Sequence, residues 1–125
     1  MRLLLDTHIF LWAVMGDSSL KAPVRRMLEE ADEVYVSAAS IWEIAIKSRL
    51  GKIEADADAL ANEIEEAGFR DLPVRLRHAA GVAKLPLYHA DPFDRLLIAQ
   101  AIAEPLKFIT ADKSLARYSE LIVVV

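Results

Sequence analysis

The chain has 125 residues, a formal net charge of −4 and no cysteine. Its length favours one compact domain over residues 1–125, and 54% hydrophobic with 27% charged residues can bury a core, which argues against disorder. Disulfides, thiolate catalysis and cysteine-based zinc sites are excluded, so oxygen or histidine must hold any metal.

No segment of the sequence predicts a membrane anchor. The longest apolar run, Ile9 to Met15, is far shorter than the ~20 residues that cross a bilayer, and Asp6 comes too early for a signal peptide. We therefore expect a cytoplasmic protein. Its negative charge argues weakly against nucleic-acid binding, unless clustered carboxylates hold divalent cations that reverse the local charge.

The chain opens with a strand and two helical segments. Arg2 to Asp6 predicts a short buried strand, and Thr7 to Val14 predicts an apolar turn or helix that ends at Gly16. Ser19 is the expected cap of a helix through Ala31, with Pro23 tolerated in its first turn.

The middle of the chain repeats this order. Valines alternate with other residues from Glu33 to Ser37, which predicts a second strand. A helix from Ala38 to Leu50 is expected to follow it. Asp56 to Ala67 predicts a further helix, and Phe69 to Val74 a short edge strand that Pro73 interrupts.

The last third predicts three helices and two strands. A helix from Arg75 to Lys84 is followed by a loop and by a helix from Asp91 to about Ala103. Lys107 to Thr110 predicts a strand, and Asp112 to Tyr118 a short helix. Leu121 to Val125 is wholly apolar and predicts a strand buried on both faces.

Strands that alternate with helices predict an α/β domain with a central, mostly parallel sheet of four to five strands and helices on both faces. In such sheets the ligand crevice lies outside the carboxyl ends of the strands. Four acids stand near those ends and are expected to converge: Asp6, Glu43, Asp94 and Asp112. We call these four residues the acidic quartet.

Most of these acids also have an ordinary structural explanation. Asp91 stands at the N-cap position of the helix that begins at Pro92, and Asp94 stands at the third position of that helix. Asp112 can cap the next helix. Glu43 can form an exposed ion pair with Lys47 at i+4. Asp6 is the exception, because a carboxylate between apolar runs needs a cation or several donors.

Four carboxylates in one place would repel one another and raise their own pKa values unless a divalent cation neutralised them. Oxygen ligands favour Mg²⁺ or Mn²⁺. The sequence therefore predicts a Mg²⁺ or Mn²⁺ site in which the acidic quartet supplies the ligands, with Asp91 as a fifth ligand or only a helix cap.

Four segments, in this order and spacing, resemble the PIN-domain family and in particular VapC-like toxins: Leu3 to His8, Val36 to Ile44, His89 to Ala101 and Phe108 to Asp112. The resemblance implies a three-layer PIN-like fold and a metal-dependent endoribonuclease whose acidic residues match the quartet. It implies Thr7 and Thr110 as nearby hydroxyl partners. It also implies a homodimer and a cognate antitoxin that occupies the active-site groove, often through an arginine.

Three basic residues neighbour the quartet and are expected to guide the RNA backbone: Lys47, Arg95 and Lys113. The histidines at 8, 78 and 89 are too scattered in sequence to predict a histidine-based metal site.

Two other functions stay open. In one, the domain is a non-catalytic dimerisation or scaffold module whose acids are helix caps. In the other, Asp6 is the phosphoacceptor of a phosphatase, although His8 stands where that class wants a second aspartate.

Overall fold

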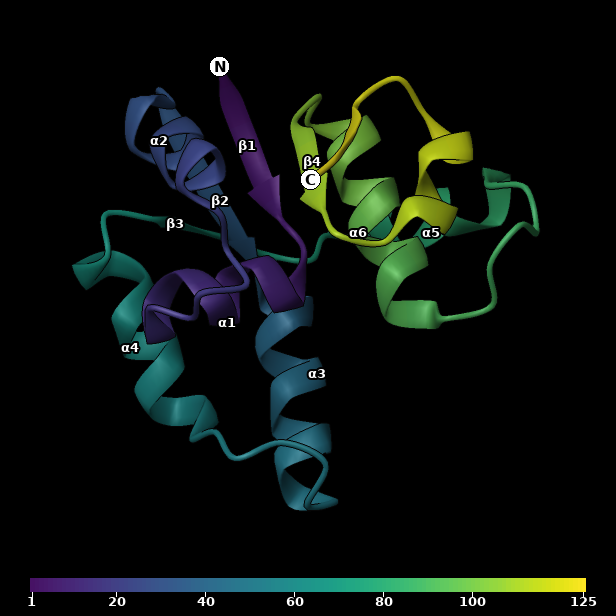
Figure 1. Ribbon diagram of the computed structural model, residues 1–125. Helices are drawn as coiled ribbons and strands as arrows, with labels where there is room; N and C mark the ends of the chain where they lie inside the picture. The colour runs from purple at the N-terminus through teal and green to yellow at the C-terminus, as the bar shows by residue number, and fades with distance from the viewer.

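The structure is a computed structural model that describes residues 1–125. A five-stranded sheet in the order β3-β2-β1-β4-β5 runs through its centre, and every neighbouring pair of strands is parallel (Figure 1). The strands are β1 (Arg2–Leu5), β2 (Glu33–Ser37), β3 (Arg70–Leu72), β4 (Lys107–Thr110) and β5 (Ile122–Val124). This confirms the predicted parallel α/β sheet.

Helices cover both faces of the sheet, as predicted (Figure 1). They are α1 (Thr7–Met15), α2 (Ala22–Glu30), α3 (Ala38–Arg49), α4 (Ala57–Glu66), α5 (Leu76–Gly81) and α6 (Pro92–Ala103), with two 3₁₀ turns, η1 (Val82–Lys84) and η2 (Lys113–Tyr118). None of these helices has the length and apolar character that spanning a membrane requires.

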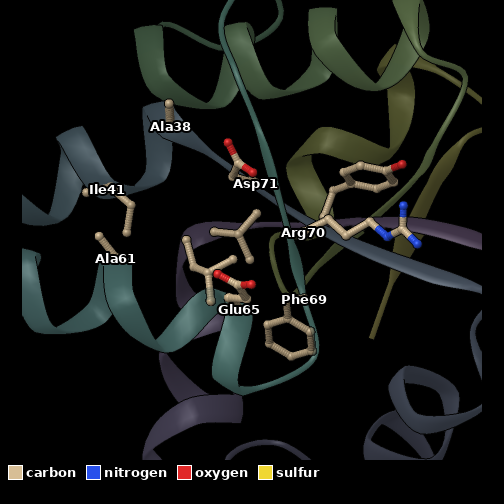
Figure 2. Close-up of a pocket in the computed structure, with 10 residues that line it drawn as sticks. Ala38, Ile41, Ala61, Glu65, Phe69, Arg70 and Asp71 are labelled. Carbon is tan, nitrogen blue, oxygen red and sulfur yellow. The ribbon is translucent and has the colours of Figure 1, made fainter.

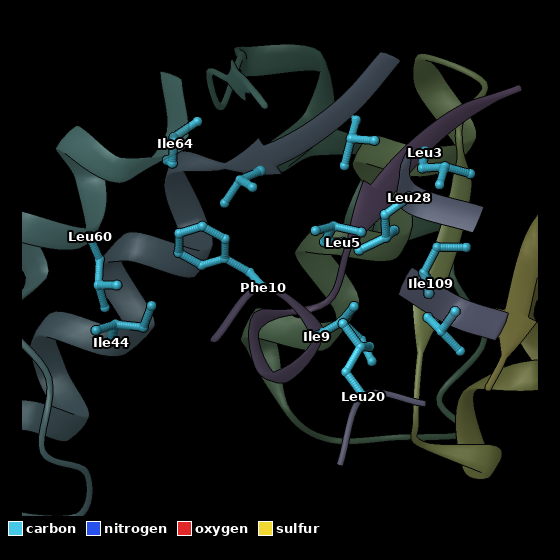
Figure 3. Packing of buried hydrophobic residues seen from close by; sticks show 13 residues of the cluster. Leu3, Leu5, Ile9, Phe10, Leu20, Leu28, Ile44, Leu60, Ile64 and Ile109 are labelled. Atoms are coloured by element: carbon cyan, nitrogen blue, oxygen red, sulfur yellow. The ribbon is translucent and has the colours of Figure 1, made fainter. Parts of the chain in front are cut away.

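The alternation of side chains along β1 divides the interior into two cores. Leu3 and Leu5 point to the face covered by α1, α2, α3 and α4, where thirteen buried residues pack together (Figure 3). Leu4 points to the other face, where it packs with Leu97 and Leu115 from α6 and η2. Leu3, Leu4 and Leu5 are all fully buried, so this strand is the centre of the fold.

Two details of the predicted elements are wrong. The helix expected from Ser19 begins at Ala22, because Asp17 accepts a hydrogen bond from the Ser19 backbone N–H at 2.8 Å and forms a separate turn before it. β5 is not buried on both faces. Its residues are half-buried because it pairs only with β4 and forms an edge of the sheet.

The strand order reverses between β1 and β4, the two central neighbours whose chain connections lead to opposite edges of the sheet. In open parallel sheets, such a reversal leaves a crevice beyond the carboxyl ends of the two strands. Asp6 follows β1 directly, and Thr110 is the last residue of β4. The topology therefore places both residues at one crevice.

Candidate metal centre

A pocket of about 290 Å³ lies at this crevice. All four members of the acidic quartet line it, together with Asp91, so the predicted convergence of these side chains is what the structure shows. Lys47 is the only lysine or arginine in its lining. The full lining is Asp6, His8, Trp12, Glu43, Lys47, Asp91, Asp94, Ala111 and Asp112.

Asp6 is held from two sides at the junction of β1 and α1. Its Oδ1 accepts the backbone N–H of Thr7 at 2.8 Å, and its Oδ2 accepts the Thr110 hydroxyl at 2.6 Å. The side chain is buried, and this burial raises the pKa of Asp6, although the two hydrogen bonds act in the opposite direction. A buried carboxylate in this state gains from a nearby cation.

Glu43 reaches the pocket from the middle of α3 and is also buried. Its Oε1 accepts the Thr7 hydroxyl at 2.7 Å, and its Oε2 accepts from Lys47 Nζ at 2.6 Å. The hydrogen bond to Glu43 raises the pKa of Lys47. Glu43 therefore forms the predicted i+4 ion pair with Lys47 and lines the acidic pocket at the same time.

Asp91 and Asp94 have different roles at the start of α6. Asp91 is the helix cap, because its Oδ1 accepts the backbone N–H groups of Phe93 at 2.8 Å and Asp94 at 3.1 Å. Asp94 points into the pocket instead. Burial, followed by the charges of Asp6 and Asp91, raises the pKa of Asp94 to about 7.

Asp112 is both a cap and a pocket residue. Its Oδ1 accepts the backbone N–H and the hydroxyl of Ser114, at 2.9 and 2.6 Å, which lowers the pKa of Asp112. Its own N–H donates to the Thr110 hydroxyl at 3.0 Å. Thr110 therefore links Asp6 and Asp112 directly, and Thr7 links the two carboxylates of Asp6 and Glu43, to which its N–H and its hydroxyl donate.

His89 is a pocket neighbour that the sequence interpretation missed. Its Nε2 lies 2.8 Å from Asp94 Oδ2, and one donor atom each from His89, Asp94 and Asp112 fall within 4.8 Å of one another. His89 lies beside the pocket without being one of its lining residues, whereas His8 lines it. The signal was the position of His89 just ahead of the Asp91–Asp94 helix start, within a segment already assigned to the site.

His78 is structural, which agrees with the sequence interpretation for this residue. It is fully buried, its Nδ1 accepts the Arg75 N–H at 3.0 Å, and its Nε2 contacts Glu104.

The expectation that Arg95 guides a phosphate backbone needs correction. Its side chain is 9% exposed, and the guanidinium donates to the carbonyl oxygens of Pro86 at 2.7 Å and Val82 at 3.2 Å. The N–H groups of Arg95 are thus bonded inside the protein, to backbone carbonyl oxygens that lie outside regular helices and strands or at their ends. Lys113 is exposed on η2 and is not among the lining residues, whereas Lys47 is.

The donor set fits a hard divalent cation. Five carboxylates line a small pocket that contains one lysine, and burial together with the charges of Asp6 and Asp91 raises the pKa of Asp94 to about 7. Carboxylate oxygens are the ligands that Mg²⁺ and Mn²⁺ prefer. A bound divalent ion would relieve the repulsion that protonation of Asp94 otherwise relieves.

The largest hollow of the molecule, about 860 Å³, lies elsewhere, between α3, α4 and the edge strand β3 (Figure 2). Its lining is mostly apolar and shares no residue with the acidic pocket. This second hollow contains only two carboxylates, Asp71 and Glu65, whereas five line the acidic pocket.

The structure is thus a parallel α/β domain with a cluster of carboxylates at its strand-order reversal. The PIN domain profile matches residues 3–121, so the chain belongs to the PIN-domain family. The chain is 30% identical over 115 residues to ribonuclease VapC22 of Mycobacterium tuberculosis, covering 90% of this chain and 88% of that protein. Family membership removes the phosphoacceptor-phosphatase interpretation.

Solved structures show the same fold. VapBC2 from Rickettsia felis, bound to a promoter DNA fragment, superposes with a TM-score of 0.70 at 14% identity and covers 100% of this chain and 98% of the other. A toxin–antitoxin complex from Klebsiella pneumoniae gives a TM-score of 0.68 at 18% identity, with 98% and 96% coverage. These similarities confirm the PIN-like, three-layer architecture.

Proposed function

We propose that this protein is a Mg²⁺- or Mn²⁺-dependent endoribonuclease and the toxin component of a toxin–antitoxin pair. The observation that carries the proposal is the convergence of the acidic quartet in one pocket of a PIN domain whose 30% identical relative is a ribonuclease. The net charge of −4 is compatible with an RNA substrate, because divalent cations in this pocket would offset much of the negative charge of its carboxylates.

When bound, the metal lowers the pKa of a water for attack on the phosphodiester and stabilises the charge on its oxygens. The quartet would hold this metal, and Thr7 and Thr110 fix the carboxylates of Glu43 and Asp6 through the hydrogen bonds described above. Lys47 is the pocket residue best placed to meet a phosphate oxygen, since its ammonium already lies at the rim beside Glu43.

The direct test is RNA cleavage by the full chain in Mg²⁺, in Mn²⁺ and in excess EDTA. Asp6→Asn preserves the shape of the side chain and removes its charge, and Asp71→Asn makes the same change in the second hollow. We expect metal-dependent cleavage that Asp6→Asn abolishes and Asp71→Asn leaves intact. Loss of cleavage in neither variant would point to another site.

The scaffold alternative makes a different prediction for the same protein. A module whose acids are only helix caps would bind no divalent cation with useful affinity and would cut no RNA. Calorimetric titration of Mn²⁺ into the wild type and Asp6→Asn separates the two functions without relying on the choice of RNA. Absence of Mn²⁺ binding in the wild type would favour the scaffold.

The proposed partner is an antitoxin that inserts an arginine into the acidic pocket. One structural neighbour is a toxin–antitoxin complex, and a guanidinium can pair with two carboxylate oxygens at once. An arginine there would compete with Mn²⁺ for the quartet, so added antitoxin should lower both Mn²⁺ affinity and RNA cleavage. The expected homodimer stays a prediction that the molar mass in solution tests.

A further inference from the structure

We propose that His89 is a metal ligand, so that the centre combines an imidazole nitrogen with the carboxylates and favours first-row transition ions such as Mn²⁺ over Mg²⁺. This inference rests on the proposed function, because it concerns the same metal. It assigns a role to a residue outside the acidic quartet, on the side of the pocket formed by Asp94 and Asp112.

The spacing of the donor atoms suits a shared ion. Two ligand atoms that each lie about 2.1 Å from one ion are about 3 Å apart at right angles and about 4.2 Å apart when opposite. His89 Nε2 and Asp94 Oδ2 are 2.8 Å apart, and the three donor atoms of His89, Asp94 and Asp112 fall within 4.8 Å. A small contraction would bring all three onto one ion.

The backbone around His89 is anchored from behind. The His89 carbonyl oxygen accepts from the Tyr118 hydroxyl at 3.4 Å and lies 3.5 Å from Arg95 Nη1. Arg95 also donates to the Tyr118 hydroxyl at 3.2 Å and to the Pro86 carbonyl at 2.7 Å. A buried arginine therefore fixes the loop that carries His89, which is the kind of support that orients a ligand.

The histidine is also accessible to an ion. Its side chain is 25% exposed, whereas Asp94 is 17% exposed, so both lie at the rim where solvent enters. A purely structural histidine in this protein looks different, as the fully buried His78 shows. Imidazole is a softer donor than carboxylate and suits transition metals, whereas Mg²⁺ prefers oxygen and retains its waters.

The test is pulsed electron paramagnetic resonance of the full chain loaded with Mn²⁺, because a coordinated imidazole gives ¹⁴N modulation that carboxylates cannot give. We expect this modulation in the wild type, its loss in His89→Gln and its retention in His8→Gln, the matched change at the histidine that lines the pocket. Thermal unfolding verifies that each variant is folded.

Titrations add a second readout. His89→Gln should weaken Mn²⁺ binding by about tenfold or more, and Mg²⁺ binding by much less. Bound Mn²⁺ without ¹⁴N modulation, or modulation that persists in His89→Gln, overturns the role of His89 and leaves the proposed nuclease standing. Failure of the wild type to bind Mn²⁺ at all overturns both proposals together.

Discussion

The Thr110 hydroxyl donates to Asp6 Oδ2 at 2.6 Å, a contact between residues 104 positions apart in sequence. It joins the carboxyl ends of β1 and β4 at the strand-order reversal. Thr110 also accepts the Asp112 N–H, so one buried side chain fixes two members of the acidic quartet.

Thr110→Val should therefore destabilise the protein and weaken its metal site. The change keeps the shape but leaves a buried carboxylate and an N–H without their partner, which costs about 1–3 kcal/mol. Urea denaturation in EDTA measures this loss, and Mn²⁺ titration measures the accompanying drop in affinity. Thr110→Ser is the control, because it retains the hydroxyl and should preserve the affinity. Equal stability of the valine variant and the wild type would show that the hydrogen bond is dispensable.

The raised pKa of Asp94 predicts a pH dependence of stability in the metal-free protein. The folded state holds a proton up to about pH 7, whereas the ordinary pKa is 3.8. Between these values the folded state binds more protons than the unfolded chain, so the free energy of unfolding should fall as pH rises and level off above pH 7.

The slope has a ceiling of about 1.4 kcal/mol per pH unit, and partial solvent access to Asp94 should keep it below that. Denaturation curves in EDTA from pH 4.5 to 8 measure it. Asp94→Asn carries no titrating proton and should lose this component. Parallel curves for the two proteins would contradict the assignment, and a saturating divalent cation should remove the decline in the wild type.

Asp91 should behave as a helix cap. Asp91→Ala removes the acceptor for the N–H groups of Phe93 and Asp94 and should cost about 0.5–2 kcal/mol of stability. Asp91→Ser keeps a capping oxygen and should recover most of this loss. If the serine variant is stable but binds Mn²⁺ far more weakly than the wild type, Asp91 is a ligand as well as a cap.

Arg95 should be a structural residue whose loss acts through the loop. Arg95→Lys retains the charge but cannot bond several carbonyl groups in different directions, so we expect a loss of about 1–3 kcal/mol on thermal or chemical unfolding. Lys113→Met, an exposed change with the loss of one charge, is the control and should leave stability unchanged within about 0.5 kcal/mol. A stable Arg95→Lys protein with weaker RNA binding would restore the original expectation.

The sequence by itself determined the order of strands and helices, and it predicted the four acids of the quartet. Periodic apolar residues set the elements, and Asp6, Asp94 and Asp112 follow strands or begin helices, which are local features of the sequence. The resemblance to PIN domains added the interpretation of those acids as one site.

Only the tertiary structure decided what each of these residues contacts. Arg95 was expected to be a surface cation because it follows Asp94 in the sequence. In the structure the loop before α6 covers Arg95, and the guanidinium donates to carbonyl oxygens of that loop. His89 looked isolated until the same loop brought it to Asp94. The apolar composition of β5 predicted full burial. Because β5 has a neighbouring strand on one side only, it is an edge strand and is half-buried. Sequence periodicity reports which residues avoid water, whereas the partner of a polar group depends on segments far apart in the chain, and only the assembled sheet brings those segments together.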